Sequence, residues 1–181
     1  MNRLSSLLLI AFGVIFIGCT KAAYQADATG AANESVNPLN LLTKDEFTWS
    51  GTPPLSAKVN GVAFQAQQAN FYFGFDTGNN RIYAYRGSDS VGFTLRLKDV
   101  YADNVYNFQY GSTLRMGTYR SDSARGPLYY SYLGNVGQVY IVRNDTAAPW
   151  TIEGKFHFQA LTAINGKLIN VSEGYFKFNK F

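Results

Sequence analysis

The stretch Trp150-Thr-Ile-Glu-Gly-Lys-Phe-His-Phe-Gln159 decides the fold class, because apolar and polar side chains alternate along it. One parity holds Trp150, Ile152, Phe156 and Phe158, and the other holds Thr151, Glu153, Lys155, His157 and Gln159. Successive side chains of a strand point to opposite faces, so this period of two predicts a strand between a core and water. Val91-Gly-Phe-Thr-Leu-Arg-Leu-Lys98 repeats the pattern. Antiparallel sheets with one solvated face show this alternation.

Similar segments surround these two. Further strands are expected at 57–66, 70–76, 81–86, 104–110, 128–133, 138–143, 164–171 and 174–180. Turn sequences separate them, and Asn60-Gly61 and Asn165-Gly166 are strong hairpin signals because they stand between alternating runs. No segment shows a convincing helical period. The sequence therefore predicts one all-β domain over residues 56–181, an antiparallel β-sandwich or an open β-barrel.

The first 19 residues have the features of an export signal. Arg3 supplies a positive start, and the 15 residues from Leu4 to Gly18 carry no charge. This run is shorter than the ~20 residues that span a bilayer, and it fits the apolar region of a signal peptide. It ends at Ile17-Gly18-Cys19, which resembles the lipobox of bacterial lipoproteins, although Phe16 stands where that pattern prefers leucine.

Cys19 is the only cysteine of the 181 residues, so no intramolecular disulfide is possible. Exported proteins rarely keep a lone thiol without a use, which disfavours the alternative of an ordinary cleaved signal. The resemblance to lipoproteins implies removal of residues 1–18, a diacylglyceryl thioether on Cys19 and an acylated amine, with chains such as palmitate. Several chains at ~0.8 kcal/mol per buried methylene give a lasting anchor, expected in the outer membrane.

The residues after Cys19 predict a flexible tether. Thr20 to Asn40 is mainly Ala, Thr, Asn, Gly and Ser, a composition that cannot bury enough surface to offset its ordering entropy. Thr43 and Glu46 have the spacing of a capping box, but no apolar helical period follows. We therefore expect residues 19–55 to be the lipidated cysteine and a coil with a mean reach of roughly 30–36 Å.

Few residues invite a catalytic role. His157, the single histidine, lies on the polar face of its expected strand, where an exposed imidazole without catalytic function is the expectation. Asp76-Thr-Gly-Asn-Asn80 lacks the carboxylate spacing of a calcium loop and predicts a hairpin tip. The acids near 122, 145 and 173 fall in expected turns, so a glycan hydrolase is the least favoured alternative. We expect no catalytic residue, no metal ligand, no cofactor and no enzymatic activity.

The charge pattern gives no nucleic-acid signal. Without Arg3 the chain has 15 basic and 12 acidic residues, and the basic residues alternate with acids and polar groups along the sequence. A nucleic-acid-binding protein would show a basic stripe.

Tyrosines are the candidate binding residues. Residues 56–181 contain 12 Tyr, 11 Phe and one Trp. Tyr83 and Tyr85 share a face with Arg81, and Tyr129 and its neighbour Tyr130 face opposite ways in a strand. We expect Tyr83, Tyr85 and Tyr129 to be exposed rings that stack on a glycan or contact a partner protein. The alternative is that tyrosine is simply common in strands and cross-strand pairs.

Five segments carry a resemblance to a known family: Lys58-Val-Asn-Gly-Val-Ala-Phe64, Asn79-Asn-Arg-Ile-Tyr83, Gly137-Gln-Val-Tyr-Ile141, Ile152-Glu-Gly-Lys-Phe-His-Phe158 and Gly174-Tyr-Phe-Lys-Phe178. They resemble a family of Bacteroidota lipoproteins of unknown function (domain of unknown function 6252), which implies the fold and no reaction. Surface-export signals of that phylum resemble an acidic cluster after the lipidated cysteine, and Thr20-Lys21-Ala22-Ala23 has none. This favours a periplasm-facing protein.

The expected function is therefore a membrane-anchored envelope module that binds a glycan or a partner protein, with a purely structural envelope role as the alternative. Three expected loops also contain Asp89-Ser90-Val91, Asp122-Ser123-Ala124 and Asp145-Thr146-Ala147. These triplets resemble the O-glycosylation acceptor of those bacteria and make Ser90, Ser123 and Thr146 candidate sites, although loops are rich in such residues by default.

Overall fold

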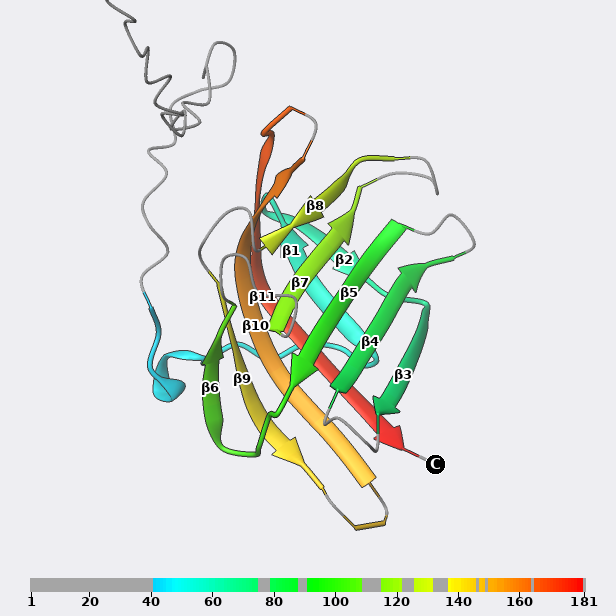
Figure 1. Ribbon diagram of the computed structural model, residues 1–181, viewed down its shortest axis with the longest axis vertical. Coiled ribbons are helices and arrows are strands. Elements are labelled where there is room, and N and C mark those ends of the chain that lie inside the picture. Colours follow the sequence, from blue (N-terminus) through cyan, green and yellow to red (C-terminus); the bar gives the residue numbers. More distant parts are fainter. Residues whose placement is uncertain are drawn as a thin grey trace, which may run out of the picture.

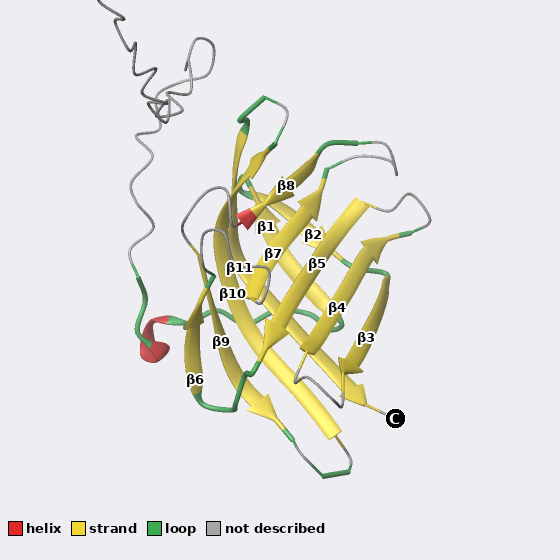
Figure 2. Ribbon diagram, viewed as in Figure 1, coloured by secondary structure: helices red, strands yellow, loops and turns green. Residues whose placement is uncertain are grey.

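A computed structural model of the chain describes residues 41–74, 79–87, 91–108, 115–121, 126–131, 137–145, 147–148, 150–163 and 165–180. A short 3₁₀ helix, η1 (Lys44–Glu46), precedes the strands β1 (Leu55–Val59), β2 (Val62–Gln65), β3 (Gln68–Gly74), β4 (Asn79–Arg86), β5 (Val91–Lys98), β6 (Asn104–Asn107), β7 (Arg115–Arg120), β8 (Leu128–Tyr130), β9 (Gly137–Asn144), β10 (Trp150–Thr162) and β11 (Leu168–Lys180). Figure 2 shows strands joined by loops almost throughout, which confirms the all-β prediction.

The strands form one antiparallel sheet that curls into a half-barrel (Figure 1). The path runs β2-β1-β11-β10-β8-β7-β5-β4-β3, so β2 and β3 are its two ends. The sheet branches at β10, whose first part pairs with β9 and whose last residues pair with β8. Strand β6 extends the branch by pairing with β9. Of the two expected architectures, the chain therefore adopts the open barrel.

Aromatic rings from β5, β10 and β11 fill the concave side of the sheet. Phe93, Phe156, Phe158 and Phe176 are all fully buried. The ring of Phe93 lies 5.8 Å from that of Phe156 and 6.2 Å from that of Phe158, in edge-to-face arrangements that add to the stabilisation from area burial. The alternation visible in the sequence thus places one parity of β5 in this core, together with Phe156 and Phe158 of β10.

Strand β7 was not among the strands expected from the sequence. Its central residues Met116 to Tyr119 are all buried, so the segment lacks the alternation of a half-buried strand. Gly117 interrupts the inward-facing row because the Phe158 ring takes its space: a Cβ at Gly117 would lie 2.5 Å from Cε1 of Phe158. This strand is therefore defined by its pairing with β5 and β8, and the local alternation of apolar and polar residues does not predict it.

The turn predictions had mixed outcomes. Asn60-Gly61 forms the β1–β2 hairpin, with φ of 49° and 80° at its two residues. The expected break between 171 and 174 is absent, because β11 runs unbroken from Leu168 to Lys180. Phe156 pairs with Gly174 and Phe158 with Val171, so β11 carries one extra residue there. Glu173, at φ 49°, lies in this β-bulge, which bends the strand without ending it.

Residues 41–54, here called the strap, pack on the outer face of β9, β10 and β11. The Leu42 N–H donates to Gln138 Oε1 at 2.6 Å, Lys155 Nζ donates to the Phe47 carbonyl at 2.7 Å, and Trp49 Nε1 donates to the Gly174 carbonyl at 2.9 Å. The expectation that the tether extends through residue 55 is therefore wrong for this part. Residues 1–40, which include the expected signal, Cys19 and the rest of the tether, lie outside the described residues.

The capping-box pair in the strap does form, in the single turn of η1. Glu46 Oε2 accepts hydrogen bonds from the Thr43 N–H at 2.7 Å and from Thr43 Oγ1 at 2.8 Å. The hydrogen bond from the Thr43 backbone holds the pKa of Glu46 below its usual value. Within the described part of the chain, no helix is long and apolar enough to cross a membrane.

Candidate functional site

The outer face of β3, β4 and β5 gathers tyrosines and arginines in register. Tyr72 of β3 lies opposite Arg81 of β4, which in turn lies opposite Arg96 of β5. Tyr83 and Tyr85 share this side of β4, because the intervening Ile82 and Ala84 are fully buried in the core. We call this surface the Tyr/Arg face and define it as Tyr72, Arg81, Tyr83, Tyr85 and Arg96.

The rings of the Tyr/Arg face are exposed to different degrees and are not parallel. Tyr72 is 58% exposed, whereas Tyr83 and Tyr85 are half-buried. The rings of Tyr72 and Tyr83 lie 5.4 Å apart at an interplanar angle of 87°. Because the two rings are perpendicular, they do not form the coplanar platform on which a sugar chain stacks.

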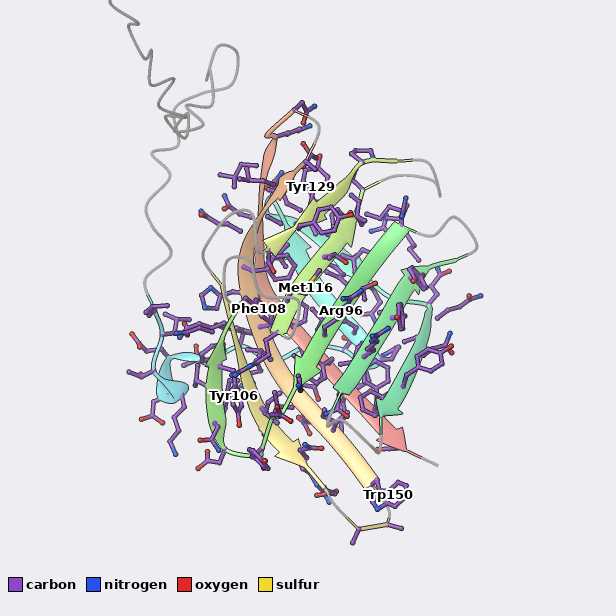
Figure 3. The ribbon with its side chains drawn as sticks, in the orientation of Figure 1. Arg96, Tyr106, Phe108, Met116, Tyr129 and Trp150 are labelled. Atoms are coloured by element: carbon purple, nitrogen blue, oxygen red, sulfur yellow. The ribbon has the colours of Figure 1, made fainter. Side chains whose placement is uncertain are left out.

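Arg81 and Arg96 are directly opposite each other on adjacent strands. Like charges in this position destabilise a sheet. Arg96 Nε is also buried without a hydrogen-bond partner (Figure 3 labels this residue on β5, beside Met116 of β7). Over the described residues, neither guanidinium has a carboxylate partner. The pair therefore constitutes an unneutralised positive centre on the convex side of the sheet.

The two halves of the sheet differ in charge. Strands β3, β4, β5, β7 and β8 contain no Asp or Glu, although they contain several arginines and a lysine. The salt bridges of the described chain all involve the strap or the half with β1, β9 and β11: Lys44–Asp103, Lys58–Glu173, Arg143–Asp145 and Lys177–Glu153. Within the described strands, the two acidic residues, Glu153 and Glu173, thus lie in one half of the sheet, whereas basic residues occur in both halves.

Tyr129 does not belong to the Tyr/Arg face. It is 2% exposed, because β8 pairs Tyr129 with Tyr119, whose ring faces the core beside Phe93. The ring centroids of Tyr119 and Tyr129 lie 6.4 Å apart. Tyr129 and Tyr130 do face opposite ways, but the exposed position expected for Tyr129 is wrong. Figure 3 places Tyr129 near the end of the half-barrel where β7 ends.

His157 is also buried, contrary to the exposed position expected from the sequence. Its side chain is 4% exposed because the strap covers it: the Phe47 ring lies 5.7 Å away and the Trp49 ring 6.4 Å away. Its Nε2 lies 3.1 Å from Gln138 Oε1, which can only accept, so the imidazole donates. Burial lowers the pKa of His157 to about 4. These contacts give the residue a packing role.

The remaining candidate sites have simple outcomes. Among the residues that the structure describes, no three His, Cys, Asp or Glu side chains come together as metal ligands would. Ser90, Ser123 and Thr146 lie outside the described residues.

Tyr72 and Arg96 were not among the candidate binding residues expected from the sequence. Their position in the alternation could have identified them, because each occupies the polar side of a strand whose other side is apolar.

Comparison with known proteins identifies a family and no function. A family model described as a domain of unknown function, DUF6252, matches residues 51–178. No curated protein and no solved structure matches the chain.

Proposed function

We propose a function for this chain, which belongs to the DUF6252 family. It is a lipid-anchored envelope module whose Tyr/Arg face binds an acidic surface of a partner protein. The observation that carries the proposal is the pairing of Arg81 with Arg96, two like charges in register without a carboxylate among the described residues. A carboxylate from a partner neutralises both guanidiniums through charge-assisted hydrogen bonds to their exposed nitrogens.

The composition of the face favours a protein over a glycan. Tyrosine and arginine are enriched at protein interfaces and dominate their binding energy. The perpendicular Tyr72 and Tyr83 rings fit a partner side chain between ring edge and ring face better than a flat sugar. Electrostatic complementarity with an acidic partner also accelerates encounter and excludes basic surfaces.

The anchor completes the proposal. A lipid on Cys19, followed by the segment up to the strap, holds the Tyr/Arg face within reach of other envelope proteins, and the absence of an acidic cluster after Cys19 supports a periplasm-facing position in the outer membrane. We propose on the same grounds that the chain is from a Bacteroidota species and that Ile17-Gly18-Cys19 is its lipobox. O-glycosylation at Ser90, Ser123 or Thr146 would add mass beyond the lipid to protein from its native host.

Lipidation has a direct test. Cys19→Ser should move the protein from the membrane fraction to the soluble fraction and prevent the mass increase from the acyl chains, because the thiol carries the thioether. Cell fractionation with intact-mass measurement checks this. A variant that stays in the membrane fraction with the mass of the parent protein would exclude the anchor.

Binding through the Tyr/Arg face is tested by charge reversal at Arg81. Arg81→Glu should lower capture of the acidic partner at least tenfold in cross-linking pull-downs from native envelopes, because it repels carboxylates. It should not destabilise the fold, since the new carboxylate faces Arg96 and such cross-strand pairs contribute about 0.2–1 kcal/mol. Thermal unfolding and quantitative mass spectrometry of the captured proteins supply the two readouts.

Lys58→Glu is the control for position, because it reverses a cation on β1, in the other half of the sheet. It also breaks the ion pair with Glu173, so thermal unfolding is measured for this variant too. Capture should survive this substitution. The assignment to the Tyr/Arg face would be refuted if both variants lowered capture of the partner equally, or if neither variant lowered it. If no protein partner is captured, and the chain instead binds an acidic glycan on an array in a way that Arg81→Glu abolishes, the ligand of the face is that glycan and not a protein.

A further inference from the structure

A pocket of about 240 Å³ is lined by residues of the β1–β2 hairpin, the ends of β4 and β7, β8 and the start of β11. Figure 1 shows these elements at one end of the half-barrel. The pocket lies on the concave side of the sheet, so it is separate from the Tyr/Arg face on the convex side. We call it the barrel-mouth pocket.

Aromatic side chains form the inner wall of the barrel-mouth pocket. Phe64, Tyr119 and Tyr129 line it and are all buried. The rings of Phe64 and Tyr119 meet edge to face at 6.2 Å. Val62 also lines the pocket and is 69% exposed, so it lies at the opening. The pocket therefore offers apolar contact from its wall to its rim.

Two cations line the same pocket. The Arg86 guanidinium lies over the Phe64 ring, 5.2 Å from its centroid, and is placed there by a cation–π contact. Lys167 lines the pocket from the loop before β11. Neither cation has a carboxylate partner in the described segments, and the described lining contains no Asp or Glu. The pocket thus combines an apolar wall with unneutralised positive charge.

We propose that the barrel-mouth pocket binds a small amphipathic anion, a carboxylate with an apolar body of about ten heavy atoms. Its volume corresponds to roughly eight waters at ~30 Å³ each, which suits such a molecule and excludes a long lipid chain. Small barrels commonly hold one small ligand in this position. The carboxylate contacts Arg86 and Lys167, and the apolar body lies against Phe64, Tyr119 and Val62.

The test is an NMR titration of the full chain carrying Cys19→Ser, with sodium octanoate and octan-1-ol as matched probes. Octanoate should produce saturable shifts at the methyl groups of Val59, Val62, Ala63 and Ile169. Octan-1-ol, which has the same body without the charge, should bind at least fivefold more weakly. Arg86→Gln and Lys167→Gln should each weaken octanoate binding threefold or more, and together at least tenfold.

Lys98→Gln removes a cation of β5 that does not line the pocket and should leave octanoate affinity unchanged. Equal affinity for the two probes, unchanged binding in the double variant, or shifts centred away from the pocket would overturn the proposal. Arg81→Glu should also leave octanoate binding unchanged, so failure of this site and failure of the Tyr/Arg face are separate results.

Discussion

Replacing Phe47 with alanine should release the strap (residues 41–54) and lower the free energy of unfolding by about 3–5 kcal/mol, the usual cost of removing a buried phenyl ring. Phe47 is 3% exposed and contacts three rings, with centroids 5.0 Å from Trp49 and 5.7 Å from both Tyr140 and His157. No other apolar side chain of the strap is as deeply buried. Its loss removes the main apolar contact that holds the segment on β9 and β10.

Urea denaturation followed by circular dichroism and by tryptophan fluorescence checks this prediction, because Trp49 lies in the strap itself. Leu41→Ala is the matched control: this side chain belongs to the same segment but is 63% exposed, so its removal should change the free energy of unfolding by less than about 0.5 kcal/mol. If the two variants were equally stable, the strap would contribute nothing to the fold and the flexible tether would extend to β1.

Acidification should produce the second large effect. Burial lowers the pKa of His157 from 6.5 to about 4 in the folded chain. Between these two pH values the unfolded chain binds a proton at His157 that the folded chain does not, so the free energy of unfolding falls as the pH falls. At 1.36 kcal/mol per pKa unit, the loss from this residue is about 3 kcal/mol, complete below pH 4 and absent well above pH 6.5.

His157→Gln should remove this part of the pH dependence, because glutamine can still donate to Gln138 Oε1 but does not titrate. The free energy of unfolding of parent and variant, measured from pH 7.5 to pH 3.5, should diverge by about 3 kcal/mol in the lower range. Carboxylates titrate in both proteins and cancel in the difference. Parallel pH profiles would show that the imidazole is not buried, and would contradict its position under the strap.

The pH effect and the strap are coupled through the same contacts. The imidazole is buried only while Phe47 and Trp49 cover it, and Gln138 joins the two by accepting from both the Leu42 N–H and His157. Protonation of His157 therefore favours states in which the strap is detached. In a Trp150→Phe variant, which leaves Trp49 as the only tryptophan of the chain, fluorescence should report this release at a higher pH than global unfolding does.

The sequence by itself determined the fold class and the inward face of most strands. In β5 and β10 the alternation of apolar and polar residues identifies Phe93, Phe156 and Phe158 as core, because a strand exposes alternate residues to opposite sides. The Asn60-Gly61 hairpin was readable for the same kind of reason, since its backbone conformation depends on those two residues alone. Membership of the family adds a domain boundary near residue 51 and no activity.

Only the tertiary structure decided which polar faces meet water and which charges stand together. His157 lies on a polar face, yet it is buried because a segment more than a hundred residues earlier packs over it. Tyr129 is buried because β8 pairs it with Tyr119. Glycine stands at position 117 of β7 because the Phe158 ring occupies the space that a Cβ would need. Arg81 and Arg96 become a pair through strand register alone. Local pattern fixes the direction of a side chain relative to its own strand, whereas its neighbours are fixed by pairing and packing between residues far apart in the chain.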